Sequence, residues 1–321
     1  FKRIAMELPT VGFLTGHGER GINGIGEREY SSFALNKKFR YALINQGFAV
    51  TEVTLEKEIP EDIKILVIAE MKEELTETET QYLDKYIARG GNLLITSEPK
   101  RLEIMAPLLN KFGIQPYPGT LVEIHENISP DLIMMAPTQE AIDLNFYFAN
   151  MQENKRCFVT PGVSGLSFNA EKGYTAIPLF ATSTEAWNEQ ETTNFIDEKP
   201  VCSGEKNEER KSFVTAYALS RKVDEKEQKV IVLGDADCFS NGEFSRSRNG
   251  VPASNYSALM GAFFWMSDEE VPIDVRRPEA PDNEIYLTEA QIGTWKLILT
   301  WIFPGVLLII SILIWLRRRG R

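Results

Sequence analysis

Short apolar runs alternate with helical patterns over the first 118 residues. Four of these runs predict buried strands, at Thr10–Thr15, Phe48–Leu55, Ile63–Ala69 and Asn92–Thr96. The longest of them, IKILVIA at 63–69, is apolar almost without interruption, which is typical of a strand that helices cover on both faces.

Three segments near these strands place apolar residues at helical spacing. Ser31–Gln46 is followed by Gly47, a residue type suited to the position just past a helix end. Thr76–Glu79 matches a capping box and opens a helix that runs to Ala88, and Leu102–Phe112 predicts a third helix. This order of elements predicts an α/β fold with a mostly parallel, doubly wound sheet and helices on both faces.

The pattern is less regular from residue 119 onward. Apolar runs occur at Thr175–Ala181 and Phe213–Ser220, whereas the polar composition of residues 187–211 predicts an exposed or mobile insertion. A buried strand returns at Lys229–Gly234, and Asn255–Met266 predicts an apolar helix. We therefore expect a flavodoxin-like half, residues 1–118, and a second, irregular α+β region, residues 119–266.

The last apolar run is much longer than the others. LILTWIFPGVLLIISILIWL, residues 297–316, has no charge, and at about 1.5 Å per residue such a helix crosses the ~30 Å hydrocarbon core of a bilayer. Trp295 and Trp315 lie at its edges, where indole rings prefer the headgroup layer. It predicts a transmembrane helix, preceded by a proline-rich juxtamembrane linker, residues 267–296; the alternative is a buried core helix.

Charge is distributed unevenly about this segment. The formal net charge is −11, but the only charges after Lys296 are four arginines, so residues 1–296 have a balance of −15. Basic residues mark the cytoplasmic side of a span, which predicts a cytoplasmic tail at 317–321 and an inner-membrane protein whose bulk is extracytoplasmic. The acidic bulk argues against nucleic-acid binding, which needs a clustered basic face.

The first ten residues, FKRIAMELPT, do not form a signal peptide. Because export of the acidic bulk requires a signal, we expect a signal or further membrane helices upstream of Phe1, and the sequence to be a piece of a longer protein. The three cysteines, Cys157, Cys202 and Cys238, do not make a disulfide scaffold, although one bridge between the first two stays open.

Motifs for the common catalytic and nucleotide sites are missing or weak. Residues 16–21 formally match G-x-G-x-x-G, but ten further residues separate them from the next predicted helix, whereas a dinucleotide site needs that helix at once. The sequence contains no P-loop, G-x-S-x-G, C-x-x-C or H-E-x-x-H motif, and its only histidines are His17 and His125. We therefore expect no cofactor, no resident metal and no catalytic residue.

Two loops at predicted strand ends carry the best candidate ligand-binding residues. In an open α/β sheet, ligands bind beyond the carboxyl ends of the strands. If the two loops converge, an imidazole and three carboxylates would surround one cleft suited to a cation, a sugar or a peptide amine. The alternative is that these residues only form turns and cap backbone amides. The residues are Gly16, His17, Gly18, Glu19, Asp235 and Asp237.

Four segments together resemble the GldG-like family, whose members are auxiliary, substrate-binding-like components of ABC-2 transporters, named for gliding motility. They are LTGHGE at 14–19, LxxYIARGGNLLI around 83–95, GDADCFSN at 234–241, and the late helix, linker and single C-terminal span. The resemblance implies an ectodomain similar to glutamine amidotransferases. The nucleophilic cysteine of that fold is not matched, because residues 93–98 read LLITSE, so the implied fold is non-catalytic.

The same resemblance implies the partners. Such a subunit would work with an ABC-2 permease and a separate cytoplasmic ATPase in the membrane, and its ectodomain would bind cargo or a periplasmic or surface protein. Two alternatives from other classes stay open. One is a membrane-anchored, metal-dependent hydrolase that uses His17, Asp235 and Asp237, and the other is a structural scaffold of a surface machine.

Overall fold

The computed structural model describes residues 8–204, 208–271 and 289–320 of the chain. Contacts divide the chain into two compact units, residues 1–274 and 275–321. The three cysteines are free thiols.

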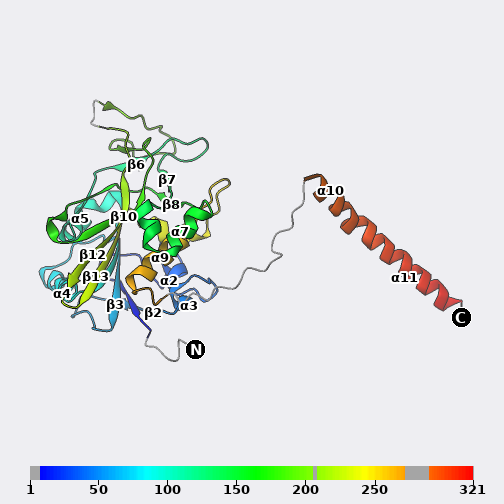
Figure 1. Ribbon diagram of the computed structural model, residues 1–321, viewed down its shortest axis with the longest axis horizontal. Coiled ribbons are helices and arrows are strands. Elements are labelled where there is room, and N and C mark those ends of the chain that lie inside the picture. Colours follow the sequence, from blue (N-terminus) through cyan, green and yellow to red (C-terminus); the bar gives the residue numbers. More distant parts are fainter. Residues whose placement is uncertain (1–7, 205–207, 272–288, 321) are drawn as a thin grey trace. The chain divides into compact units, whose positions relative to one another are not determined.

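In the first unit, nine described strands form one sheet (Figure 1). Five of them are neighbours and pair in parallel, and in spatial order they are β2 (Ala49–Val53), β1 (Thr10–Leu14), β3 (Ile63–Ala69), β4 (Asn92–Thr96) and β13 (Lys226–Leu233). This is the flavodoxin-like order, in which the winding direction switches between β1 and β3. The prediction of a large, mostly parallel sheet is confirmed.

The remaining strands of this sheet are antiparallel to their neighbours and extend it beyond β13. They are β12 (Val214–Val223), β10 (Thr175–Ala181), β9 (Leu166–Phe168) and β5 (Ile114–Pro116). Strand β13 comes from the second predicted region but lies inside the parallel part, next to β4. The two predicted regions therefore contribute to one continuous sheet.

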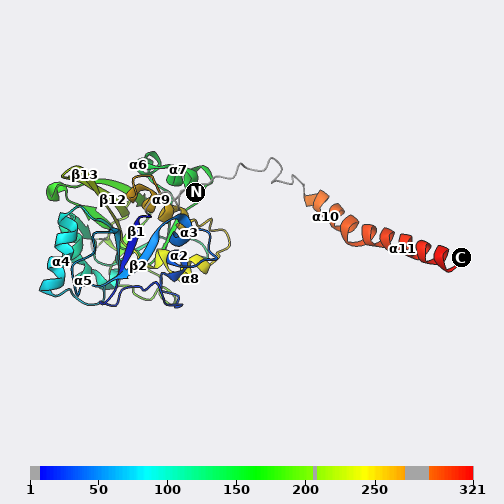
Figure 2. The ribbon, with the colours of Figure 1, turned by 90° about the horizontal axis from the view of Figure 1, so that it is seen from below.

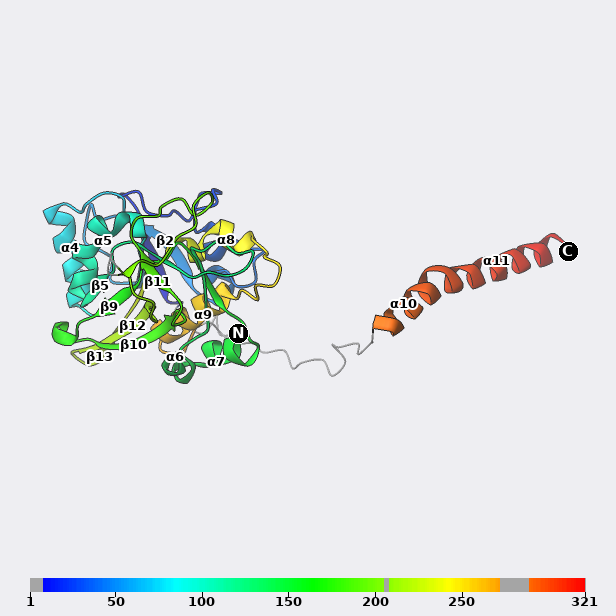
Figure 3. The ribbon, with the colours of Figure 1, turned by 90° about the horizontal axis from the view of Figure 1, so that it is seen from above.

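Helices cover both faces of the sheet (Figures 2 and 3). One face packs against α4 (Glu77–Ala88) and α5 (Leu102–Lys111), and the other against α2 (Ser31–Ala34), α3 (Leu43–Gln46) and α9 (Asn255–Met266). The strands serve both cores by alternation: in β4, Leu94 belongs to the α9 side, whereas Leu93 and Ile95 belong to the α4 side.

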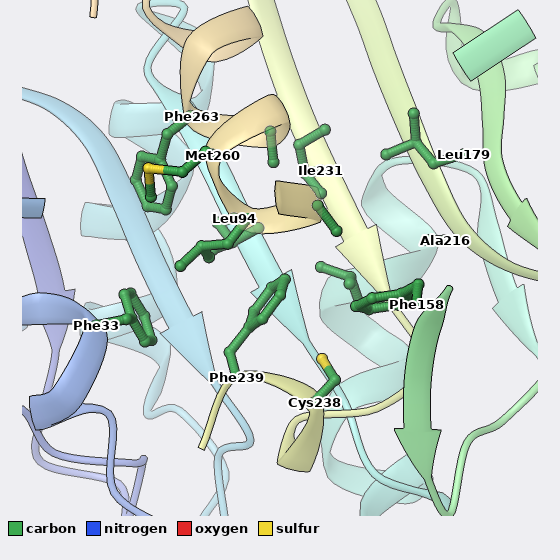
Figure 4. Packing of buried hydrophobic residues seen from close by; sticks show 14 of the residues in the cluster. Phe33, Leu94, Phe158, Leu179, Ala216, Ile231, Cys238, Phe239, Met260 and Phe263 are labelled. Carbon is green, nitrogen blue, oxygen red and sulfur yellow. The ribbon is translucent and has the colours of Figure 1, made fainter. Parts of the chain in front are cut away.

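Helix α9 is buried on nearly all sides. Met260 and Phe263 pack with Leu94, Ile231 and Phe33 in one cluster (Figure 4). At the start of the helix, the Asn255 amide donates to the carbonyl oxygens of Val159 and Cys238. Because these bonds replace water on the buried Asn255 amide, this largely apolar helix can begin inside the core.

The predicted capping box at the start of α4 is confirmed. The Thr76 hydroxyl accepts from the Glu79 amide N–H at 3.3 Å, and the Glu79 carboxylate accepts from the Thr76 N–H at 2.8 Å. We expect Thr76→Ala to destabilise the protein by about 1 kcal/mol, since it removes one side of this reciprocal cap. Urea unfolding measures the change, and Thr80→Ala, inside the same helix, is the matched control that should cost less.

The single helix predicted over Ser31–Gln46 is wrong, because the chain forms two short helices, α2 and α3. The Asn45 side chain, in α3, donates to the carbonyl oxygens of Asn36 and Phe39 in the segment that connects the two helices. Such side-chain bonds give the backbone an alternative to the helical ladder. Phe39 also packs against Phe244, a contact that helical periodicity does not reveal.

The segment 187–211, predicted to be an exposed insertion, begins with a buried strand. β11 (Trp187–Glu189) pairs antiparallel with β6 (Thr120–Val122), and the Trp187 side chain lies in the protein interior. Exposed apolar side chains follow at Ile196 and Val201. Residues 119–266 also contain β7 (Leu132–Met135), which pairs with β8 (Phe158–Pro161), and the helices α6 (Gln139–Leu144), α7 (Phe146–Glu153) and α8 (Asn241–Ser245).

In the second unit, α10 (Glu289–Leu297), a π-helical turn (Ile298–Ile302) and α11 (Phe303–Arg319) follow one another. The stretch from Gln291 to Arg319 is long and apolar enough to cross a membrane, and it contains the predicted segment 297–316. The π-helical turn ends two residues before Pro304, which has no N–H to donate, and such local changes of helix type accommodate proline in membrane spans. Most of the predicted linker lies outside the described residues.

Candidate functional site

The loops after β1, β3, β4 and β13 bring five charged side chains together at the carboxyl edge of the parallel strands. They are Arg20, Glu70, Glu98, Asp235 and Asp237, and we call them the strand-end cluster. The loops after β1 and β3, which carry Arg20 and Glu70, flank the switch point of the sheet, where α/β folds bind ligands.

Backbone hydrogen bonds hold these loops in register. The Arg20 N–H donates to the carbonyl of Ala69, and the Glu70 N–H donates to that of Thr96. Gly234 leads from β13 into Asp235, and a Cβ atom there would lie 2.1 Å from the carbonyl oxygen of Ser164. The close approach of these two backbones requires glycine and fixes where the Asp235 side chain begins.

The Arg20 guanidinium is the buried cation of the cluster, with a residue exposure of 2 %. Its Nε donates to Glu70 Oε2 at 3.1 Å, while one terminal nitrogen lies 2.8 Å from Glu98 Oε1 and the other lies 2.5 Å from Asp237 Oδ1. Arg28, whose side chain is 58 % exposed, contacts Glu70 Oε2 at 3.1 Å from the rim. The planar guanidinium of Arg20 thus joins three carboxylates from three different loops.

Glu98 and Asp235 are buried carboxyl groups of the cluster that accept backbone hydrogen bonds. Asp235 is 0 % exposed, and its Oδ1 accepts from the Asp237 N–H at 2.6 Å. Glu98 Oε1 accepts from the N–H groups of Ala236 and Asp237. Burial raises the pKa of both Glu98 and Asp235 above the usual range, and repulsion from neighbouring carboxylates adds to it, although Arg20 acts in the opposite direction.

A pocket of about 160 Å³ opens beside the cluster. Asp237, whose side chain is 31 % exposed, belongs to both the cluster and the pocket wall. The wall carries charges of both signs, and its Glu243 is held by two bonds from Arg248. The lining residues are Glu27, Arg28, Pro161, Asp237, Ser240, Gly242, Glu243 and Arg246. This geometry suits a small polar ligand or an ion with its water shell.

The structure places His17 in a separate arrangement of side chains. Its Nδ1 lies 3.2 Å from Glu19 Oε1, and its Nε2 lies 3.1 Å from Glu79 Oε1, at the start of α4. Gly16 and Gly18 have φ of 127° and 74°, so they form the turn that presents this histidine. The loops after β1 and β13 do converge, but Arg20 and not His17 makes the contact with Asp237.

Three carboxylates lie close enough to share an ion. Glu98, Asp235 and Asp237 each offer one oxygen, and these oxygens lie within 4.8 Å of one another. In the part of the chain that the structure describes, this set does not include His17.

Arg20, Glu70 and Glu98 were not among the residues expected from the sequence to form a site. Glu70 directly follows β3, and Glu98 lies two residues after the end of β4. The signal was therefore present, because charged residues just after neighbouring parallel strands meet at one edge of the sheet.

A family model described as "ABC-type uncharacterized transport system" matches residues 8–262. The chain belongs to this family of auxiliary ABC-type transport components. The auxiliary-family match includes every residue of the strand-end cluster and confirms the resemblance to GldG-like proteins. It makes the protein an auxiliary ABC-type transport component that carries a C-terminal apolar helix. None of the curated proteins matches the chain.

Three solved structures that match this auxiliary-family chain share little sequence with it. The mmIFT52 N-terminal domain has a TM-score of 0.53 at 16 % identity, over 80 % of this chain and 97 % of that domain. An exo-β-1,4-mannosidase, Op5Man5 from Opitutaceae bacterium strain TAV5, has a TM-score of 0.41 at 13 % identity, over 81 % of this chain and 37 % of the mannosidase chain. A thua-like protein from Parabacteroides merdae has a TM-score of 0.41 at 8 % identity, over 85 % of this chain and 94 % of that protein. The first of these shows a shared fold.

Proposed function

We propose that the protein is a membrane-anchored, extracytoplasmic subunit of an ABC-2-type transporter, and that its first unit binds cargo or a protein partner. The observation that carries this proposal is the auxiliary-family match over residues 8–262, followed by a helix long enough to span a membrane. A permease and a separate cytoplasmic ATPase are the partners such a subunit needs, and gliding motility is one process in which it would take part.

The charge distribution supports the orientation and the inner-membrane location. The four arginines after the apolar helix favour the cytoplasm for the C-terminus, and the −15 balance of residues 1–296 suits the opposite side.

A non-enzymatic role is supported by the side chains that stand where a nucleophile would be expected. In a glutamine-amidotransferase-like arrangement, the segment after β4 would carry the cysteine, but it carries Ser97, whose hydroxyl donates to the carbonyl of Leu233 at 3.2 Å. Cys238 is buried, and its thiol donates to the carbonyl of Asp235. Both groups are engaged by backbone oxygens, whereas an activated nucleophile is paired with a base.

Crosslinking of the full chain in its native membranes tests the proposed partners. We expect an ABC permease and its ATPase to copurify with the crosslinked chain. As a matched control, residues 297–316 are replaced by an unrelated apolar span of the same length, which keeps the anchor and should lose the permease crosslinks. Copurification that yields neither a permease nor an ATPase would overturn the proposed function.

The orientation has its own test. A cysteine at Ile196, which is 93 % exposed, or at Gly320 is introduced into a chain whose three native cysteines are serine. In intact cells opened only at the outer membrane, a membrane-impermeant maleimide should label the first cysteine and spare the second. The reverse pattern would place the bulk of the chain in the cytoplasm.

A further inference from the structure

We propose that Glu98, Asp235 and Asp237 form a binding site for a divalent cation that prefers oxygen ligands, such as Mg²⁺, Mn²⁺ or Ca²⁺. The site does not depend on the proposed transport role, because it follows from the geometry of the strand-end cluster alone.

The two oxygens of each of these carboxylates differ in their hydrogen-bond partners. The described protein donors reach Oε1 of Glu98, Oδ1 of Asp235 and Oδ1 of Asp237. These bonds fix the orientation of each group, and they leave its second oxygen without a described donor. A metal site needs ligands that are held in place in this way while one oxygen remains available.

The Asp235 carboxylate has an unpartnered oxygen. Its Oδ2 is buried and has no hydrogen-bond partner among the described residues. A buried polar atom without a partner carries a desolvation cost that native proteins avoid, so such an atom calls for an explanation. Asp235 also offers one of the three carboxylate oxygens that lie within 4.8 Å of one another, so a cation held by the three groups would lie beside this unpartnered carboxylate.

The balance of charge in the cluster also favours a bound cation. The cluster has four carboxyl groups, whereas only Arg20, which is buried, and Arg28, which contacts Glu70 from the rim, pair closely with them. Ionisation of all four groups would leave two negative charges without a partner among these two arginines. Arg101 lies 4.0 Å from Glu70 and is 43 % exposed, where water screens its charge. A divalent ion supplies the compensation that buried carboxylates require.

The ligand types and the access route narrow the kind of ion. All three groups are carboxylates, which suit Mg²⁺, Mn²⁺ and Ca²⁺ better than softer metals. Asp237 lines the 160 Å³ pocket, so an ion can enter from solvent and keep water molecules as its remaining ligands. These ions need six or more ligands, and water completes such sets.

Manganese titration of the full chain in detergent micelles tests the proposal. The protein is treated with a chelator, exchanged into metal-free buffer and titrated with MnCl₂, while electron paramagnetic resonance counts the free ion. We expect one saturable Mn²⁺ per chain, displaced by MgCl₂ or CaCl₂, and a rise in Tm on binding. Asp235→Asn and Glu98→Gln should each weaken Mn²⁺ binding at least tenfold, whereas Glu185→Gln, in a remote exposed ion pair, should leave it unchanged.

Unfolding in the presence of chelator separates a lost ligand from a lost fold. Without metal, Asp235→Asn removes a buried carboxyl group, so its Tm should equal or exceed that of the wild type. The proposal is overturned if the wild type binds no saturable Mn²⁺, or if both cluster variants bind it as tightly as Glu185→Gln does. If Asp235→Asn does not fold, Glu98→Gln and the wild-type stoichiometry decide alone, and neither result depends on whether a permease copurifies.

Discussion

Replacement of Arg20 by methionine should destabilise the protein by about 3–5 kcal/mol, the usual cost of removing one partner from a buried ion pair. The methionine fills a similar volume but leaves Glu70, Glu98 and Asp237 facing one another without the guanidinium that now joins them. Urea unfolding in chelator-treated buffer, followed by the fluorescence of the buried tryptophans, measures the loss.

Arg28→Met is the matched control, because Arg28 contacts two of the same carboxylates, Glu70 and Asp237, from an exposed position. An exposed pair contributes about 0–1 kcal/mol, so this variant should remain close to the wild type. Equal losses of unfolding free energy for the two variants would contradict this prediction, because burial of Arg20 would then not explain its contribution to stability.

Phe239→Ala should cost about 3–5 kcal/mol, as expected for removal of a fully buried aromatic ring from a packed core. The ring is 1 % exposed and lies between Phe33 and Phe158, with centroid distances of 6.2 and 5.9 Å (Figure 4). The Phe239 ring therefore links α2 to β8, and Phe239 itself lies only two residues after Asp237 in the chain. Thermal and urea unfolding both measure the effect.

Phe244→Ala provides the comparison for this variant. Phe244 stacks on Phe239 with a centroid distance of 6.5 Å but is only half-buried, so less apolar area is lost. Its substitution should cost less than half as much, and a larger cost for Phe244 than for Phe239 would contradict the packing described.

Local signals account for the elements that sequence reasoning placed well. Asn255–Met266 is apolar from Ala258 onward, and Thr76 and Glu79 carry both halves of a cap, so local sequence is enough to predict α9 and the start of α4. The break between α2 and α3 depends instead on Asn45 and on Phe39 packing against Phe244, a residue far away in the sequence. Helical periodicity contains no information about that contact.

The candidate site was predicted in part for a similar reason. Asp235 and Asp237 follow an obvious strand, and their convergence with the loop after β1 was anticipated as a condition. Which residue of that loop makes the contact depends on the order of strands: β4 lies between β3 and β13, so Glu98 stands beside Asp235, and Arg20 reaches across to Asp237. Sequence spacing alone does not distinguish this from a site built on His17.

The position of β13 beside β4 has a consequence for how the protein folds. Strands β1 to β4 end by Thr96, yet β13, the strand that pairs with β4, begins only at Lys226. All the residues between them must be synthesised before β13 can pair with β4. Until then β4 presents an unpaired edge, and contacts between such distant segments form slowly. A subunit that crosses a membrane during synthesis would therefore emerge with an open sheet, and its strand-end cluster would assemble last, after the late strand has joined.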